Sequence, residues 1–373
     1  MARPRGGLDG SRAKVLLPLL IVSLVGLSAW RLWPQKPPAL TTVEPGTAPS
    51  MTFSGDTMGS TYKVTVVGAL GEAEQHIIED LIAAELGEVH RQMSTWRPDS
   101  EISRFNASRE LAPFPASRGL LEVVKTAREI SEASGGAFDV TVTPLIAAWG
   151  FGPGGRKDAA PTEAEIEALR AQIGWSGVHV DLVAGTLKKD RPELTLELSA
   201  IAPGYAADRI AARLRDAGHL RSLVDVGGEI LASGLGPHGD AWRLGIERPD
   251  SSGGVVQDIV VVQDQALATS GDYRNYYERD GVRLSHTIDP RTGRPIAHKL
   301  ASVSVLHRSA ALADGWATAL NVLGPDEGLA LASKHNLAAL FLVRGASGPF
   351  EERSTPAFAA LRPNARAATL SQP

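Results

Sequence analysis

The stretch 285–324 constrains the fold of this chain more than any other part of it. Its second residue is His286, which a turn rich in proline and glycine follows; the alternating run "LASVSVLH" comes next, and the stretch ends at Gly324. The alternation predicts a half-buried strand over 300–307. The apolar residues that follow predict a helix, so a turn, a strand and a helix are expected in direct succession.

This helix carries an acid and a hydroxyl on one side. Asp314 and Thr318 stand four residues apart, which places both oxygens on the same helix face. Such a pair suits Mg²⁺, a hard cation that takes few protein ligands and leaves room for phosphate. The same pair is also common on solvated helix faces, so the spacing alone leaves both interpretations open.

Elsewhere the predicted helices and strands do not alternate one for one, and no repeat is visible. Apolar spacing, glycine stops and a Thr162–Glu165 capping pattern predict helices over 72–92, 117–134, 162–172, from a Pro203-Gly204 turn to Gly218, and 327–335. Alternating runs predict strands within 60–67, 137–152, 178–183, 194–198, 222–234, 242–249, 258–271 and 338–345, a hairpin over 272–289, and a loop over 93–106. This mixture predicts the α+β class, with mixed or antiparallel sheets and helices packed on them.

The first 33 residues have the pattern of a membrane anchor or signal peptide. Basic residues precede a mostly apolar run over 15–30, an arrangement that keeps the N-terminus in the cytoplasm. The run is short for a full span, and the bulky Leu27 makes Leu27-Ser28-Ala29 a poor cleavage site, so we favour an uncleaved anchor. The body of the protein is therefore expected outside the cytoplasm, anchored to the inner membrane or exported to the periplasm.

Composition divides the remaining chain into three segments and excludes several kinds of functional site. Residues 34–50 predict a Pro- and Thr-rich linker, 51–361 a single folded domain, and 362–373 a flexible tail. The chain has no cysteine, which excludes disulfides, thiolate nucleophiles and iron–sulfur clusters. A net charge of −4 without a long basic run in the domain argues against a nucleic-acid partner.

Seven segments occur in an order that is specific as a set. They are "MGSTY", "MSTWRPDSEISRFN", "GAFDVTVTPL", "ELSAIAPGYAAD", "DVGGEILASG", "ALATSGDYRNYY…HTIDPRTGRP" and "ADGWATALNVLG". Together they resemble the successive motifs of the FAD:protein FMN transferases, the ApbE family, over about Thr52 to Leu361. The resemblance implies an ApbE-like fold, related to the T-fold, and a Mg²⁺-dependent enzyme that uses FAD as substrate. Such an enzyme moves FMN onto a threonine or serine hydroxyl of an acceptor flavoprotein, typically a membrane redox subunit, and releases AMP.

The resemblance also implies roles for particular residues. The metal ligands would be Asp314, Thr318 and the backbone carbonyls of Ala200 and Ala317, and the FAD contacts would come from Met58, Trp96, Ala137, Phe138, Asp139, Glu197 and Ile288. Trp96 would offer a stacking surface, while Pro203 stands where the family often has Lys or Glu, so a cofactor contact from that side chain is not expected.

His286 is the candidate base, because a neutral imidazole is the usual proton acceptor near pH 7. Its other interpretation is a histidine that stabilises the turn beside Asp289. Asp289 itself either orients His286 or caps the turn "DPRTG". The sequence leaves these roles open.

Two other functions remain compatible with the same motifs. A Mg²⁺-dependent FAD pyrophosphatase would release FMN and AMP when water, in place of an acceptor hydroxyl, reaches the phosphorus. The other function is that of a non-catalytic, exported flavin-binding protein, which would need no metal ligands. The presence of Asp314 and Thr318 argues against it.

Overall fold

The computed structural model describes residues 46–152, 155–157, 159–250, 255–272, 276–279, 282–345 and 350–362. The predicted anchor or signal peptide, most of the linker and all but the first residue of the tail lie outside these ranges and stay predictions. Within the described ranges, no helix combines the length and the apolar character that crossing a bilayer requires.

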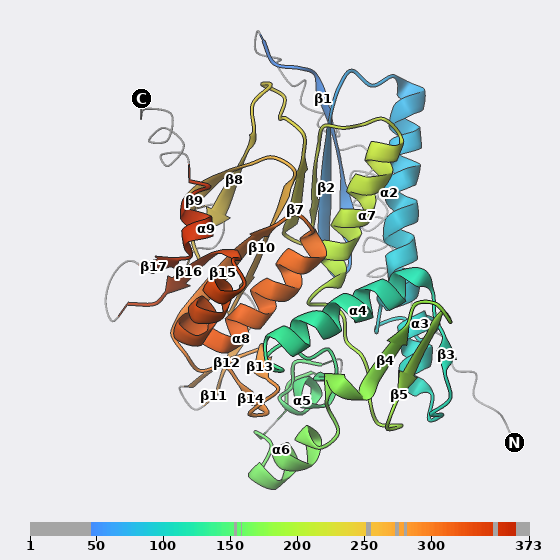
Figure 1. Ribbon diagram of the computed structural model, residues 1–373, viewed down its shortest axis with the longest axis vertical. Helices are drawn as coiled ribbons and strands as arrows, with labels where there is room; N and C mark the ends of the chain where they lie inside the picture. Colours follow the sequence, from blue (N-terminus) through green and yellow to red (C-terminus); the bar gives the residue numbers. More distant parts are fainter. Residues whose placement is uncertain are drawn as a thin grey trace, which may run out of the picture. The chain divides into compact units, whose positions relative to one another are not determined.

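An eight-stranded sheet forms the centre of the domain (Figure 1). Every neighbouring pair in it is antiparallel. Its strands, in spatial order, are β1 (Ser50–Thr57), β2 (Ser60–Val67), β6 (Ser222–Val226), β7 (Glu229–Ser233), β10 (Gln265–Gly271), β15 (Leu300–His307), β16 (Ala338–Val343) and β17 (Glu351–Ser354). Short hairpins join β1 to β2 and β6 to β7. The run 222–234, predicted as a strand, is therefore two strands that turn at Gly227 and Gly228.

Both faces of this sheet are covered. The larger apolar core lies between one face and the helices α2 (Glu72–Met93), α4 (Arg118–Ala133), α7 (Ala202–Asp216) and α8 (Ala310–Lys334). A second core lies between the other face and the hairpin β8–β9 (Trp242–Glu247, Val256–Val262) with α9 (Pro356–Ala359). β15 is therefore buried along almost its whole length, where the alternation predicted a half-buried strand. Of its two serines, Ser304 has a hydrogen-bond partner, because its Oγ lies 2.7 Å from Thr269 Oγ1 on the neighbouring strand.

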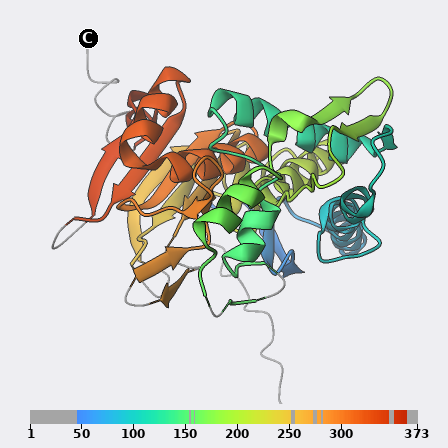
Figure 2. The same ribbon diagram turned by 90° about the horizontal axis from the view of Figure 1, so that it is seen from below.

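The remaining elements form two groups. Beside α2 and α4 lie α3 (Glu101–Ala107), a 3₁₀ turn (Trp175–Gly177) and the small sheet of β3 (Phe114–Pro115), β5 (Thr186–Lys189) and β4 (Val178–Asp181) (Figure 1). The second group consists of α5 (Thr143–Ala148), α6 (Glu163–Arg170) and the hairpins β11–β12 (Tyr276–Arg279, Val282–Ser285) and β13–β14 (Ile288–Asp289, Arg294–Pro295). Leu145 of α5, Ile166 of α6 and Ile288 of β13 share a third apolar cluster. The green segment with α5 and α6 thus lies against the orange hairpins (Figure 2).

Most predicted helices are confirmed, including the capping box of Thr162 and Glu165. The two helices expected on either side of Gly324 lie within α8, which bends there. Gly324 has a φ of 78°, and a Cβ on it would lie 2.7 Å from the His298 ring. Pro325 then restarts the helix, a position where its missing N–H costs little.

Two segments were predicted wrongly because local side-chain bonds decide them. The expected loop over 93–106 contains α3, which Ser100 caps by accepting the Ser103 N–H at 3.1 Å. The expected strand at 137–152 is instead a turn followed by α5. The Asp139 carboxylate accepts bonds from the Thr141 N–H and hydroxyl and so closes this turn.

Two further predictions fail near residue 200. The run 194–198 is extended but belongs to no sheet, since the Asn106 side chain bonds both the N–H and the C=O of Leu196 at 2.7 and 2.9 Å. The expected Pro203-Gly204 turn is the first turn of α7, where proline is well tolerated. A Cβ on Gly204 would lie 2.6 Å from the carbonyl carbon of Ala310, so glycine allows α7 and α8 to approach closely.

Candidate active site

Three adjoining cavities open beside the ends of α7 and α8. The helix cavity, of about 680 Å³, is lined by Met58, Val89, His90, Met93 and Trp96, among others. The central cavity, of about 560 Å³, is lined from α8, the β13 turn and the segment 137–140. The hairpin cavity, of about 510 Å³, lies between α5 and the β11–β12 hairpin. All three include Glu197 and Ser199 in their walls, so the cavities meet at this segment.

The central cavity collects most of the residues predicted for the site. Its walls contain Met58, Ala137, Phe138, Asp139, Glu197, Ala200, His286, Ile288, Asp314 and Thr318. Trp96 lies in the walls of the other two cavities. Ala317 is buried on α8 between Asp314 and Thr318, and Asp289 is buried in the turn directly after Ile288. Segments far apart in sequence thus meet as predicted; their roles toward a ligand stay predictions.

Asp314 is a buried carboxylate in the wall of this cavity, with 7% of its surface exposed. The N–H of Gly204 donates a hydrogen bond to its Oδ2 at 3.2 Å. Burial raises the pKa of Asp314 to about 7, and the nearby Asp208 carboxylate adds to the rise. A bound cation would remove this penalty by stabilising the ionised form.

The oxygen atoms in the wall of the central cavity suit a hard cation whose remaining ligands come from a substrate. Among the residues that the structure describes, no three His, Asp or Glu side chains come together as a metal site would require. A cation in the central cavity would therefore depend on Asp314, the Thr318 hydroxyl and backbone carbonyls. Mg²⁺ accepts such a set, because it commonly takes one or two carboxylates and completes its shell with water and phosphate oxygens.

Asp208 of α7 fixes the helix that carries Asp314. Its carboxylate accepts hydrogen bonds from the Ser309 hydroxyl at 2.7 Å and from the N–H groups of Ala310 and Ala311 at 2.7 and 3.0 Å. These are the first backbone donors of α8, which would otherwise lack partners. Burial raises the pKa of Asp208, whereas the three bonds favour its ionised form.

His286 lies where the central and hairpin cavities meet. It contributes to both walls, and its ring packs edge-on against Phe151 with 6.4 Å between the ring centroids. The backbone on either side is held, since the Thr287 N–H donates to Ser285 Oγ at 3.1 Å and the Ile296 N–H donates to the Thr287 carbonyl at 3.0 Å. The imidazole therefore stands on a fixed turn between two cavities.

Asp289 supports this turn. Its carboxylate accepts the N–H of Arg291 at 2.9 Å and pairs with the guanidinium of the same residue at 3.0 Å. Its carbonyl accepts the Gly293 N–H at 2.8 Å. These contacts are those of the turn-capping role; orientation of His286 by Asp289 stays a prediction.

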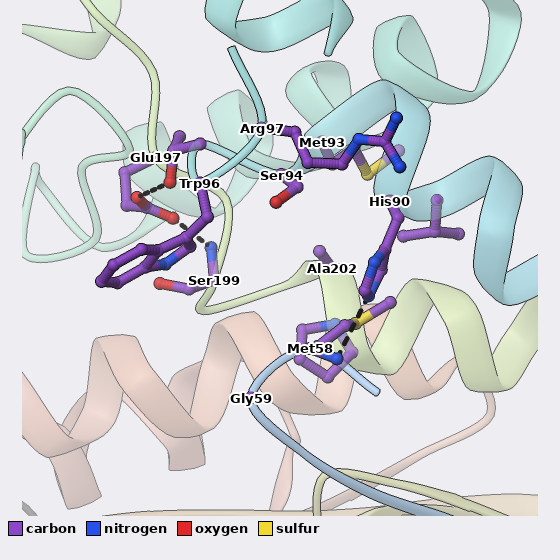
Figure 3. Close-up of a pocket in the computed structure, with 13 residues that line it drawn as sticks. Met58, Gly59, His90, Met93, Ser94, Trp96, Arg97, Glu197, Ser199 and Ala202 are labelled. Atoms are coloured by element: carbon purple, nitrogen blue, oxygen red, sulfur yellow. Dashed lines mark hydrogen bonds between the residues drawn. The ribbon is translucent and has the colours of Figure 1, made fainter. Parts of the chain in front are cut away.

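Met58 is held in an unusual conformation at the border of the helix and central cavities. Met58 and Gly59 form the two-residue β1–β2 turn with φ values of 49° and 71°. This region disfavours a residue with a side chain, and such strain is concentrated at functional sites. The Met58 N–H donates to His90 Nε2 at 3.1 Å, which ties the turn to α2 (Figure 3). Burial and the nearby Arg97 cation lower the pKa of His90, so the neutral acceptor form is favoured.

Trp96 and Glu197 face Met58 and His90 across the helix cavity (Figure 3). Trp96 is 77% exposed, unusually high for a tryptophan and suitable for a stacking surface. Glu197 is held on both carboxylate oxygens, by the Thr95 hydroxyl at 2.8 Å and by the Ser199 N–H at 2.9 Å. Its carboxylate thereby fixes the segment shared by all three cavities.

Asp139 uses its carboxylate within the protein. Besides both bonds from Thr141, it accepts the Trp175 N–H at 3.1 Å. Burial raises its pKa, and these three donors counteract the rise. A contact between this segment and FAD stays a prediction.

Sequence reasoning missed His90, Asp208 and the aromatic wall of the hairpin cavity. His90 precedes "MSTW" by one helical turn, yet only the tertiary fold brings it to the Met58 turn. Asp208 looks like any polar position on α7. The pairing of Phe151 with Tyr277, 5.0 Å between centroids, joins segments separated by more than a hundred residues.

The comparisons with known proteins agree on one family. Residues 58–341 match the model of the ApbE family. The FAD:protein FMN transferase of Vibrio cholerae serotype O1 is 44% identical over 306 residues, which cover 82% of this chain and 91% of the relative.

Solved structures are similar as well. The flavin transferase ApbE from Vibrio cholerae has a TM-score of 0.77 at 42% identity, covering 84% of this chain and 99% of that one. The flavinyl transferase ApbE of Pseudomonas stutzeri, in its apo form, also has a TM-score of 0.77 at 42% identity, with 85% and 98% covered. The predicted α+β class is thus confirmed as an ApbE-like fold with antiparallel sheets.

Proposed function

The chain belongs to the ApbE family, and on that premise we propose that it transfers FMN from FAD to a serine or threonine hydroxyl of an acceptor flavoprotein and releases AMP. One structural observation supports this proposal independently of the relatives' names. The candidate base His286 borders the cavity that contains Asp314 and Thr318, and it also borders a second cavity open to another reactant.

FAD would extend from the helix cavity into the central cavity. Met58 and Trp96 give the helix cavity an apolar and aromatic wall that suits a flat ring system. The central cavity has the oxygen donors that a phosphate–metal complex needs, on Asp314 and Thr318. Glu197 stands where the two parts would join.

In the transfer, the acceptor hydroxyl oxygen attacks the phosphorus of the FMN half. A new O–P bond forms, the P–O bond to the AMP phosphate breaks, and the hydroxyl proton passes to the imidazole of His286. His286 can hold that proton at the border of the two cavities because its turn is fixed by Asp289 and Ser285. AMP leaves with the bridging oxygen.

Mg²⁺ would be held by Asp314, Thr318 and the carbonyls of Ala200 and Ala317. When bound, it would neutralise negative charge on the phosphate oxygens and so lower the barrier to attack. The buried Asp314 carboxylate in the cavity wall supports this use of the site.

We also propose that the reaction takes place outside the cytoplasm, on an acceptor that is a membrane redox subunit. The support is the basic flank and apolar run of residues 1–33, which favour attachment to the inner membrane. A linker of residues 34–50 would let the domain reach an acceptor at the same membrane.

The test is a reaction of the purified protein with FAD, Mg²⁺ and an acceptor domain that carries a candidate serine or threonine. Mass spectrometry should show an acceptor gain equal to FMN less water, and chelation of the metal should abolish it. AMP and free FMN without an adduct would instead identify a pyrophosphatase. Intact, bound FAD without AMP would identify a binding protein.

A further inference from the structure

We propose that Lys189 and Asn106 are positioning residues for FAD binding. Their side chains take the place of a neighbouring strand along the run 194–198 and so fix Glu197 in the cavity walls. The inference rests on the proposed function in one respect, since it takes Glu197 as a contact of FAD. It assigns a role to a buried lysine that lies outside all seven sequence motifs.

The run 194–198 has the side-chain pattern of a strand but no strand beside it. Leu194, Leu196 and Leu198 are fully buried, whereas Glu197 between them reaches the walls of all three cavities. An extended segment outside a sheet has no ladder partners for its N–H and C=O groups. Other groups therefore have to pair with the backbone if this segment is to keep one position.

Lys189, at the end of β5, pairs with the first residue of the run. Its Nζ donates to the Leu194 carbonyl at 3.1 Å and to the Phe105 carbonyl, in the last turn of α3, also at 3.1 Å. The same Nζ lies 5.0 Å from the centroid of the Phe105 ring. Lys189 thereby joins the run 194–198 to α3.

Lys189 occupies this position at a cost in free energy. Only 2% of its surface is exposed, and the two carbonyls and the ring that it contacts carry no net charge. Burial lowers the pKa of Lys189 and the nearby Arg109 cation lowers it further, although Glu193 acts in the opposite direction. An apolar side chain would fill this space without the penalty of burying a charge. The two hydrogen bonds, and not packing, therefore explain a lysine here.

Asn106, the penultimate residue of α3, pairs with the middle of the run. Its side-chain amide donates to the Leu196 carbonyl at 2.9 Å and accepts the Leu196 N–H at 2.7 Å. A residue on a neighbouring antiparallel strand exchanges the same two bonds with its partner. We call Lys189 and Asn106 the clamp, because both connect the run to the C-terminal end of α3.

The clamp determines where Glu197 stands. Glu197 follows Leu196 directly, its N–H donates to the Val140 carbonyl at 2.7 Å, and its carboxylate accepts the Thr95 hydroxyl at 2.8 Å. Figure 3 shows this carboxylate beside Trp96 in the helix cavity. Neither clamp residue belongs to the walls of the three cavities, so any effect of the clamp on FAD passes through the run that it holds.

FAD titrations measure this role separately from turnover. The full-length protein is titrated with FAD in the presence of Mg²⁺ and without an acceptor, and flavin fluorescence reports the affinity. Lys189→Met keeps the length of the side chain but removes Nζ, and it should weaken FAD binding about tenfold. Asn106→Ala should weaken it about threefold to tenfold, and it carries the same test if Lys189→Met does not fold. Lys188→Met changes the exposed neighbouring lysine of β5 and should bind FAD as the wild type does.

A double variant tests whether the clamp acts through Glu197. Glu197→Ala alone should weaken FAD binding about tenfold. Adding Lys189→Met to it should weaken binding by less than about a further twofold, because both changes remove the same contact. At saturating FAD, the single-turnover rate of FMN transfer by Lys189→Met should stay within about twofold of the wild type. A lysine that only stabilised the fold would lower the melting temperature and leave the FAD affinity unchanged.

Unchanged FAD affinity in both clamp variants would overturn the inference. So would unchanged affinity in Glu197→Ala, or losses that multiply in the double variant, because the clamp would then not act through Glu197. A wild-type protein that binds FAD but forms no FMN adduct would contradict the proposed function. The affinities of the variants would still decide the role of the clamp.

Discussion

At the scale of single residues, two buried or half-buried groups decide how the site responds to metal and to pH. Asp314 is an acid that burial drives toward its neutral form, and His90 is a base that burial also drives toward its neutral form. For Asp314 that preference is a penalty which a cation can remove. For His90 the neutral form is the one that holds the turn, because only the neutral ring accepts the Met58 N–H.

Asp314→Asn should separate the metal's effects on stability and on activity. The folded-state pKa of about 7 lies above the ordinary 3.8, so folding favours protonated Asp314, and this contribution is lost as pH rises through about 7. Without metal at pH 8, the variant should therefore melt at a higher temperature than the wild type.

Added Mg²⁺ should raise the melting temperature of the wild type alone, and transfer by the variant should fall at least about 100-fold. Thermal melts with and without Mg²⁺, beside a transfer assay, measure both. An unchanged transfer rate, or a Mg²⁺-dependent melting shift in the variant, would contradict the metal assignment.

His90 should make the site sensitive to mild acid. Its pKa in the folded protein lies below the ordinary 6.5, so its stabilising contribution is present above pH 6.5 and is lost as pH falls through the lowered pKa. Loss of the bond to Met58 is worth about 1 kcal/mol, or roughly a fivefold weakening of FAD binding.

FAD titrations between about pH 7.5 and about pH 5.5 test this. His90→Gln keeps an acceptor that does not titrate, so its FAD affinity should be less dependent on pH than that of the wild type. His76→Gln, on the same helix but with an exposed side chain, is the control and should behave as the wild type. Identical pH profiles for all three proteins would show that His90 does not position the turn.

At the scale of elements, α7 and α8 act as one unit. Asp208 supplies the cap of α8, and Gly204 permits the contact between the two helices at the point where Asp314 accepts the Gly204 N–H. Ala200 lies just before α7, while Thr318 lies on α8. The spacing of the predicted metal ligands therefore depends on the packing of these two helices.

Gly204→Ala should disturb that packing. The added Cβ would lie 2.6 Å from the Ala310 carbonyl carbon, and overpacking of this kind costs about 1–3 kcal/mol. Urea unfolding should show the loss, and the Mg²⁺ concentration for half-maximal transfer should rise.

Gly87→Ala is the matched control. Gly87 lies on α2 with no atom within 4 Å of an added Cβ, so the change should stabilise the protein by about 0.5–1 kcal/mol. If Gly204→Ala also stabilised the protein and left the Mg²⁺ requirement unchanged, the close approach of the two helices would not govern the site.

The elements also show what could be predicted from sequence. Long helices with clear periodicity were predictable, because their signals are local. Residues 137–142 and 194–198 were not, since their conformation depends on the side-chain bonds of Asp139 and Asn106. The motifs predicted most residues of the central cavity, whereas His90 and Asp208 act through contacts that only the folded chain creates.

At the scale of the whole domain, the antiparallel sheet and its helices bring three cavities to one segment, 197–199. His286 borders both the central and the hairpin cavity. In the proposed reaction, what fills the hairpin cavity would therefore decide whether water or an acceptor hydroxyl attacks.

The rate of FMN transfer from bound FAD in His286→Ala tests this account most directly. FAD affinity, measured by the change in flavin fluorescence, should stay within about twofold of the wild type, because the proposed contacts of the FAD rings are Met58 and Trp96 and not His286. The single-turnover rate of adduct formation should fall about 100-fold to 10,000-fold, as expected for loss of a general base. An unchanged rate from bound FAD would contradict the account and would remove His286 from the chemistry.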